Sequence, residues 1–183
     1  MHRDMDYQHI IDFWFLETEP AQWWRQSDEF DRRIGERFGA VLAQAAQCEL
    51  YAWRAAPLGR LAEIIVLDQF SRTIHRATAQ AFASDSMALA LAQEAIAAHA
   101  DDALEPAKKA FLYMPFMHSE SPEMHAIAVS LFGQVGLDSY LQFELRHKAI
   151  IDRFGRYPHR NALLGRVSSE EEIEFLKTPG SSF

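Results

Sequence analysis

Residues 154–166 carry a mixture of side chains that an ordinary surface loop does not need. Arginine, histidine and asparagine alternate there with glycine, proline and large apolar residues. Glycine permits unusual backbone dihedrals, proline fixes one, and each guanidinium offers five donors in a fork that matches a carboxylate or a phosphate. The stretch therefore predicts a sharply turning backbone from which cationic groups project toward an anion.

A second set of polar residues interrupts the helix predicted over residues 58–75. Apolar side chains lie on two opposite faces of this helix, which is typical of a central and buried position. Asp68, Arg72 and His75 continue one of those faces, and a charge inside a fold must be paired or reach water through a cavity. The spacing fits either a bridge between Asp68 and Arg72 that only holds helices together, or a functional site.

A third set follows Pro115. Proline lacks a backbone donor and is expected to end or kink the helix predicted over residues 107–114. His118 and Glu120 would then lie in a loop beneath a wall of aromatic and methionine side chains. Both are side chains suited to general acid–base catalysis.

These three sets favour an anion pocket where the central helix meets the last loop. The residues expected to bind the anion are Arg72, Arg76, His147, Arg153, Arg156, His159, Arg160 and Asn161, and those expected to act in catalysis are Asp68, His118 and Glu120. The pocket requires more guanidinium groups than the nearby carboxylates can neutralise. If these carboxylates do neutralise the arginines, the constellation is a structural clamp; they are Asp68, Glu120, Glu144 and Asp152.

Two other classes of function stay open from the sequence. An interaction scaffold would bind an acidic peptide or a partner helix along an open basic groove. A small hydrolase acting on an anionic substrate would use Asp68 or His118 to activate water, because a buried carboxylate near arginines stays ionised and suits a base. The sequence does not fix the oligomeric state.

No metal or other cofactor is expected. The candidate metal ligands are His118, Glu120, His147 and His159, but no two histidines have the i, i+4 spacing of a helical zinc site. Cys48 is the one cysteine, so it can form no disulfide within the chain. No Gly-rich phosphate loop of either standard kind is present.

Charge and hydropathy narrow the class of protein. With 18 Lys and Arg against 26 Asp and Glu, the chain has a formal net charge of −8, which disfavours general nucleic-acid binding. Residues 144–166 are an exception, with six cations, two anions and a local charge of +4. No apolar run approaches the roughly 18–20 residues of a membrane span, and residues 1–6 do not resemble a secretory signal. The expected location is the cytoplasm, with no nucleic-acid or membrane partner.

Helical periodicity predicts an all-α fold, and no run keeps the period-2 alternation of a strand. Helices are expected over residues 7–16, 58–75, 107–114, 138–154 and 170–176, with others beginning after Ser27, Ser84 and Ser121. Residues 1–183 are expected to form one domain, with residues 177–183 as a C-terminal tail.

With these motifs the chain resembles the bacterial domain of unknown function 924 over nearly its whole length. The segments that carry the resemblance are Ile11-Asp12-Phe13-Trp14-Phe15, Leu67-Asp68-Gln69-Phe70-Ser71-Arg72, Phe82-Ala83-Ser84-Asp85, Phe111-Leu112-Tyr113-Met114-Pro115 with His118-Ser119-Glu120, Phe154-Gly155-Arg156-Tyr157-Pro158-His159-Arg160-Asn161, and Gly180-Ser181-Ser182-Phe183. The resemblance implies a fold similar to tetratricopeptide-like α-α arrays, in which antiparallel helix pairs build a concave face. It implies no established activity.

Overall fold

Helices make up most of the backbone of residues 6–183, which are the residues that this computed structural model describes. The α-helices are α1 (Tyr7–Asp12), α2 (Asp28–Ala46), α3 (Pro57–Ile65), α4 (Ser71–Ile74), α5 (Asp85–Ala97), α6 (Pro106–Met117), α7 (Pro122–Phe132), α8 (Asp138–Phe154) and α9 (Glu170–Leu176). Turns of 3₁₀-helix cover Pro20–Trp24, Tyr51–Ala55, Ala79–Phe82, Ala100–Ala103 and Pro158–Arg160, and turns of π-helix cover Phe13–Glu17 and Val66–Phe70. These residues contain no β-strand, and the predicted all-α fold is confirmed.

Local capping chemistry sets several helix ends. At the start of α2, Oγ of Ser27 accepts a hydrogen bond from the backbone N–H of Phe30 at 3.3 Å. At the start of α9, Ser169 and Glu172 form a reciprocal capping box. Helix α8 ends at Gly155, whose φ of +68° is a left-handed conformation that glycine adopts without a Cβ clash. The predicted bounds of α8 and α9 are confirmed.

The predicted central helix is present as three consecutive segments: α3, the π-turn Val66–Phe70 and α4. Most of its apolar side chains are fully buried, including those of Leu61, Ile64 and Leu67. The π-turn contains Asp68, which is also buried. A π-turn inserts an extra residue into the helical ladder and is frequent at functional sites, because it changes the direction of side chains relative to a regular helix.

Helix α6 does not end at Pro115 as the sequence predicts. It continues to Met117, and His118 is its C-cap residue, with the His118 N–H bonded to the carbonyl of Met114 at 3.0 Å. Pro115 lies near the end of the helix, so it removes a single backbone donor and the last turn still closes around it. His118 is therefore fixed to the end of a buried helix, while Glu120 lies in the loop before α7 as expected.

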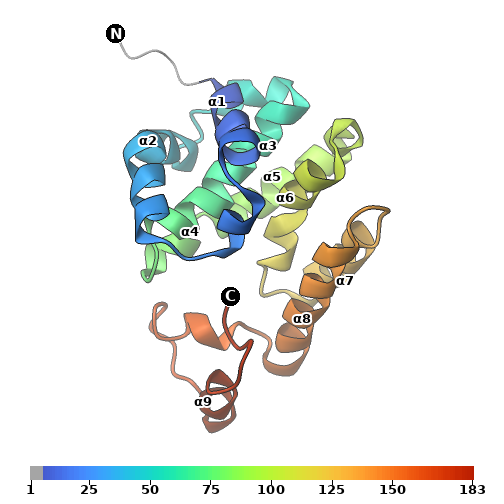
Figure 1. Cartoon of the computed structure of the whole chain (residues 1–183). Helices are drawn as coiled ribbons and strands as arrows, with labels where there is room; N and C mark the ends of the chain where they lie inside the picture. Colours follow the sequence, from blue (N-terminus) through green and yellow to red (C-terminus); the bar gives the residue numbers. More distant parts are fainter. Residues whose placement is uncertain (1–5) are drawn as a thin grey trace.

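From α5 to α8, consecutive helices pack as neighbours. Figure 1 shows α7 and α8 side by side, next to α6, with α9 below them and the helices from α1 to α5 on the other side of α6. The short turn between α7 and α8 makes this pair antiparallel. The closer assignment to a tetratricopeptide-like array stays a prediction.

Within residues 6–183, none of the helices combines the length and the apolar character needed to cross a lipid bilayer. The prediction about a secretory signal rests on residues 1–6, of which residues 1–5 lie outside the described part of the chain. The cytoplasmic location also stays a prediction.

Candidate functional site

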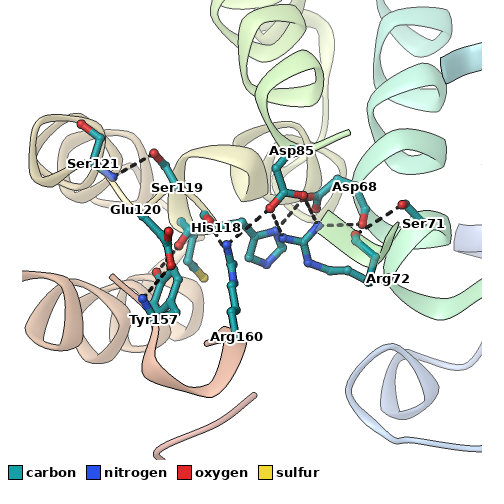
Figure 2. A network of polar contacts seen from close by, with 12 residues as sticks. Asp68, Ser71, Arg72, Asp85, His118, Ser119, Glu120, Ser121, Tyr157 and Arg160 are labelled. Atoms are coloured by element: carbon teal, nitrogen blue, oxygen red, sulfur yellow. Dashed lines mark hydrogen bonds and ion pairs between the residues drawn. The ribbon is translucent and has the colours of Figure 1, made fainter. Parts of the chain in front are cut away.

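Five polar side chains from five separate segments meet at one end of the central helix (Figure 2). Asp68 comes from the π-turn, Arg72 from α4, Asp85 from the first turn of α5, His118 from the end of α6 and Arg160 from the turn Pro158–Arg160. The site combines residues that lie far apart in the sequence: Asp85 and Arg160 are separated by 75 residues. The sequence predicted four of these five residues for the site, and it missed Asp85.

Arg72 joins two carboxylates into a network. Its Nη1 donates to Oδ1 of Asp68 at 3.0 Å, and its Nη1 and Nη2 donate to the two oxygens of Asp85 at 2.7 and 2.8 Å. Paired in-plane donors on a carboxylate form a strong, charge-assisted contact. The predicted bridge between Asp68 and Arg72 is present, and Asp85 extends it to α5.

His118 contacts Asp68 and lines a pocket. Its Nδ1 lies 2.7 Å from Oδ1 of Asp68. In the described part of the chain its Nε2 has no hydrogen-bond partner, and this atom stays accessible. The side chain lines a partly open pocket of about 320 Å³ between α5, the end of α6 and residues 160–164.

The protonation of this pair follows from its surroundings. Burial alone would raise the pKa of Asp68, but the charge that His118 carries when protonated at low pH, the charge of Arg72 and the hydrogen bonds to the carboxylate hold this pKa well below its usual range. Burial lowers the pKa of His118, and the charge of Arg72 lowers it further against the opposing effect of Asp68. At neutral pH Asp68 is therefore ionised and His118 neutral, so Nδ1–H donates to the carboxylate and Nε2 carries an accessible lone pair.

Arg160 is a buried cation with incomplete partners. Its Nη2 donates to the carbonyl of His118 at 3.0 Å, its Nη1 is 3.5 Å from Oδ2 of Asp85, and its Nε is buried without a partner within residues 6–183. The guanidinium lies over the rings of Phe82 and Tyr157, at 4.7 and 4.5 Å from their centroids. Burial and the nearby Arg72 lower the pKa of Arg160 to about 10, so an added anion beside it would be stabilised.

Glu120 lines the same pocket but has strong partners of its own. Its two oxygens accept hydrogen bonds from Nη1 and Nη2 of Arg166 at 2.6 and 2.8 Å, and one of them also accepts the backbone N–H of Tyr157 at 2.8 Å. Burial opposes ionisation, but the hydrogen bonds from Arg166 and Tyr157 outweigh it and lower the pKa of Glu120. These contacts make Glu120 an anchor between the loop before α7 and the last loop.

Three predicted ligand-binding arginines are not brought to this pocket. Arg76 pairs with Asp31 of α2, Arg153 with Glu171 and Arg156 with Glu172 of α9; the hydrogen bonds in this set run from 2.5 to 2.9 Å. The predicted convergence is wrong for Arg76, Arg153 and Arg156. Each is paired with a carboxylate from another segment, and this carboxylate neutralises its charge away from the pocket.

Asn161 forms side-chain hydrogen bonds to two other residues of the last loop. Its Oδ1 accepts from Nε of Arg166 at 2.9 Å, and its Nδ2 donates to Oγ of Ser168 at 3.0 Å. Both polar ends of the buried amide are thereby satisfied, which leaves it no free group to offer a ligand. Asn161 lies next to the pocket residue Arg160 in sequence and supports the backbone that carries it.

The expected excess of positive charge is absent at the pocket. Arg72 and Arg160 stand against Asp68 and Asp85, so the cluster is balanced when His118 is neutral. What distinguishes Arg160 is the position of its partners and not the number of charges. The sequence signal for Asp85 was its place in the motif with Ser84 at the start of a helix, but a first-turn acidic residue is also ordinary helix-end chemistry.

His147 and His159 lie behind Tyr157 and do not line the pocket. Nδ1 of His147 donates to the carbonyl of Phe143 at 2.8 Å, and its ring centroid is 3.7 Å from that of Phe183. The centroid of His159 is 4.8 Å from Phe183, so the C-terminal tail docks on this pair of rings. Burial lowers the pKa of His147 to about 3 and that of His159 to about 4.

His147, which is buried, and His159, which is half-buried, are expected to make folding acid-sensitive. In the unfolded chain a histidine gains a proton near pH 6.5, whereas His147 and His159 stay neutral in the folded protein until the pH is far lower. The unfolded state therefore binds more protons below pH 6.5, and each histidine lowers the free energy of unfolding by up to about 1.4 kcal/mol per pH unit as the pH falls. Urea unfolding at pH 6.5 and 5.5 is expected to show a loss about 1 kcal/mol smaller in His147→Asn than in the unaltered protein. His99→Asn, at an exposed position, is the control and is expected to match the unaltered protein; an unchanged loss in His147→Asn would contradict the assignment.

No group of three or more His, Cys, Asp or Glu side chains in residues 6–183 is arranged to hold a metal ion. The chemistry that the arrangement supports is instead that of a histidine whose tautomer is fixed by a carboxylate. The same pair of contacts orients the base in hydrolases of several unrelated folds. Here the histidine lines a pocket that is also lined by a cation, Arg160.

Comparison with known proteins establishes the family. A family model described as "Bacterial protein of unknown function (DUF924)" matches residues 10–180. A solved structure described as "Structure of Protein of Unknown Function ATU0120 from Agrobacterium tumefaciens" is 35% identical in sequence, with a TM-score of 0.89 over 93% of this chain and 96% of that chain. No curated protein matches the chain. Since the family model covers nearly all of the sequence and a structure of similar sequence has the same fold, the chain belongs to the DUF924 family of bacterial proteins of unknown function.

Proposed function

We propose that the pocket beside α5 and the end of α6 binds a small organic anion and that His118 acts on it as a general base. The observation that carries the proposal is the state of His118: Asp68 fixes its Nδ1, its Nε2 is accessible and has no partner in the described part of the chain, and His118 lines the same pocket as Arg160. A base must have an accessible lone pair within reach of bound substrate, and a cation nearby gives an anionic substrate its orientation.

Arg160 is the group proposed to hold the anion. It is 4% exposed, and its one carboxylate contact is the long approach to Asp85. Aromatic rings cover its flat surface, so its in-plane N–H groups are the part left to interact with a planar anion. An anion in the pocket would complete the coordination that the protein leaves unfinished.

The proposed reaction is hydrolysis. Nε2 of His118 takes a proton from a water molecule as its oxygen attacks the substrate, and the ionised Asp68 stabilises the imidazolium that forms. The bond between the attacked carbon and its leaving group, an ester or amide bond of the substrate, then breaks, and the proton passes from Nε2 to the leaving group. Arg72 contributes indirectly, because it keeps Asp68 ionised and oriented through the contact at 3.0 Å.

The proposed base is tested by acylation of imidazole, which needs no substrate. Diethyl pyrocarbonate attacks an unprotonated, accessible imidazole nitrogen, and mass spectrometry locates the product. His118 is expected to react in the unaltered protein and at least about tenfold more slowly in Asp68→Asn, where the tautomer is no longer fixed. His125 is fully buried, so its lack of reaction shows that the protein is folded. His99 is exposed, so its reaction shows that the reagent is active. Reaction of His118 no faster than that of His125 would refute an available base.

The anion is tested by thermal shift with panels of small carboxylates, phosphates and sulfonates. Arg160→Gln is expected to abolish the rise in melting temperature that the unaltered protein shows with a binding anion. Arg153→Gln is the matched control, since Arg153 is half exposed and lies away from the pocket. No response to any anion at millimolar concentration, or an equal loss in both variants, would overturn this part of the proposal.

A further inference from the structure

We infer that the occupant of the pocket is an amphipathic monocarboxylate, with one carboxylate and a short hydrocarbon chain or ring, and not a phosphate. This inference rests on the proposed function and names the part of the substrate that the pocket would bind; the ester or amide bond that is hydrolysed joins this part to its leaving group. It comes from the distribution of charge and apolar surface around the 320 Å³ space.

The charges on the wall suit a single negative charge. Arg160 is the cationic residue among those that line the pocket, while Asp85 and Glu120 line it as carboxylates. A phosphate dianion placed against Arg160 would also face these two carboxylates, and like charges within a few ångströms disfavour each other strongly. A carboxylate brings half that charge and matches the two in-plane donors of a guanidinium.

Part of the pocket lining is apolar. The apolar residues Phe82, Leu89, Pro115 and Leu164 line the same pocket as Arg160, and they come from four different segments of the chain. Leu164 is 38% exposed and lies in the residues that follow the turn of Arg160. A ligand held by its carboxylate at Arg160 would therefore bury a hydrocarbon portion against these side chains, with a gain that grows with the apolar area removed from water.

Phe82 connects the two halves of the pocket. Its ring lies under the guanidinium of Arg160 at 4.7 Å and also near that of Arg72 at 5.6 Å. The ring therefore prevents water from reaching one face of Arg160 while it contributes to the apolar wall. This arrangement favours a ligand whose charged and apolar parts are directly joined.

Four probes of matched structure test the inference by NMR titration of the His118 imidazole signals: hexanoate, acetate, hexyl phosphate and hexanol. Hexanoate is expected to bind at least about tenfold more tightly than acetate, because acetate lacks the hydrocarbon chain. It is also expected to bind at least about tenfold more tightly than hexyl phosphate, because of the wall carboxylates. Hexanol, without an anion, is expected to cause no saturable shift.

Variants separate this inference from the proposal on which it rests. Leu89→Ser and Leu164→Ser are expected to weaken hexanoate about tenfold and leave acetate unchanged, while Leu145→Ser, on the exposed side of α8, is the control. If hexyl phosphate binds more tightly than hexanoate and the binding is lost in Arg160→Gln, the proposed function stands and the monocarboxylate is wrong. If none of the probes binds in a manner that depends on Arg160, both fail.

Discussion

Replacement of Arg72 by methionine is expected to lower the free energy of unfolding by about 3–5 kcal/mol. Methionine retains most of the length of the side chain but none of the charge. Asp68, which is 1% exposed, and Asp85 would then lose the guanidinium that neutralises both. Breaking a buried ion pair from one side is costly because the remaining charge stays out of water without compensation.

Arg76→Met is the matched control for this measurement. Arg76 lies four residues further along the chain and pairs with Asp31 through two contacts, but it is 38% exposed. An exposed ion pair contributes about 0–1 kcal/mol, so the same substitution is expected to have a small effect there. Denaturation in urea would measure both, and equal losses would show that the network at Arg72 is not the buried, neutralised cluster described above.

Adding Asp68→Leu to Arg72→Met separates loss of a charge partner from loss of packing. If the burial of an unpaired Asp68 is the main cost, the double variant is expected to regain part of the stability lost in the single variant. If the double variant is instead less stable than Arg72→Met, by as much as Asp68→Leu alone destabilises the unaltered protein, the loss in Arg72→Met comes from packing.

The helices follow from the sequence because their signals are local. Ser27, Ser169 and Gly155 fix helix ends through contacts within a few residues, and the apolar faces of the central helix report its burial. The pair of Asp68 and Arg72 is local for the same reason, since i and i+4 lie on one face of a helix. Even the π-turn at Asp68 leaves this contact in place.

The partners of the other arginines do not follow from the sequence. Arg76 forms an ion pair with Asp31, which is 45 residues away in the sequence, and Arg156 forms one with Glu172, which is 16 residues away. A local charge of +4 therefore gives no measure of the field in the folded protein, because carboxylates from other segments arrive beside the cations. Only the packing of helices decides which guanidinium, here that of Arg160, is left with incomplete partners.

The sequence also hides a second histidine–carboxylate pair. His125 of α7 and Glu144 of α8 are both 0% exposed, with 2.7 Å between Nδ1 and Oε1. Nε2 of His125 donates to the carbonyl of Ser119 at 2.8 Å. This pair is closed on every side, whereas the pair of His118 and Asp68 has an open Nε2, so the two share a contact but differ in what the histidine can do.

Replacement of His125 by leucine is expected to lower the free energy of unfolding by about 3–5 kcal/mol at pH 7. In the unaltered protein one proton lies between Nδ1 and Oε1, and the pair is neutral overall whichever atom holds it. Without His125, Glu144 would be a buried carboxylate with no partner, and its Oε2 already has none within residues 6–183. His9→Leu, at an exposed position in α1, is the control and is expected to change stability by less than about 0.5 kcal/mol.

The loss in His125→Leu is expected to depend on pH in a direction that identifies Glu144. Burial raises the pKa of Glu144 above its usual value, and removal of His125 takes away the partner that opposes this shift. The folded variant then holds a proton on Glu144 that the unfolded chain has already released above about pH 4.5. Its stability is therefore highest at or below that pH and falls as the pH rises toward the pKa of the folded protein.

Glu144→Gln in the His125→Leu background is expected to remove this dependence, because glutamine has the same shape and does not titrate. Urea unfolding of the single and double variants between pH 4.5 and 7 would measure it, and parallel curves would show that Glu144 is not the group responsible. His125 also holds the carbonyl of Ser119, the residue next to His118. The loss of this hydrogen bond is therefore expected to slow acylation of His118 as well, which would show that the closed pair positions the open one.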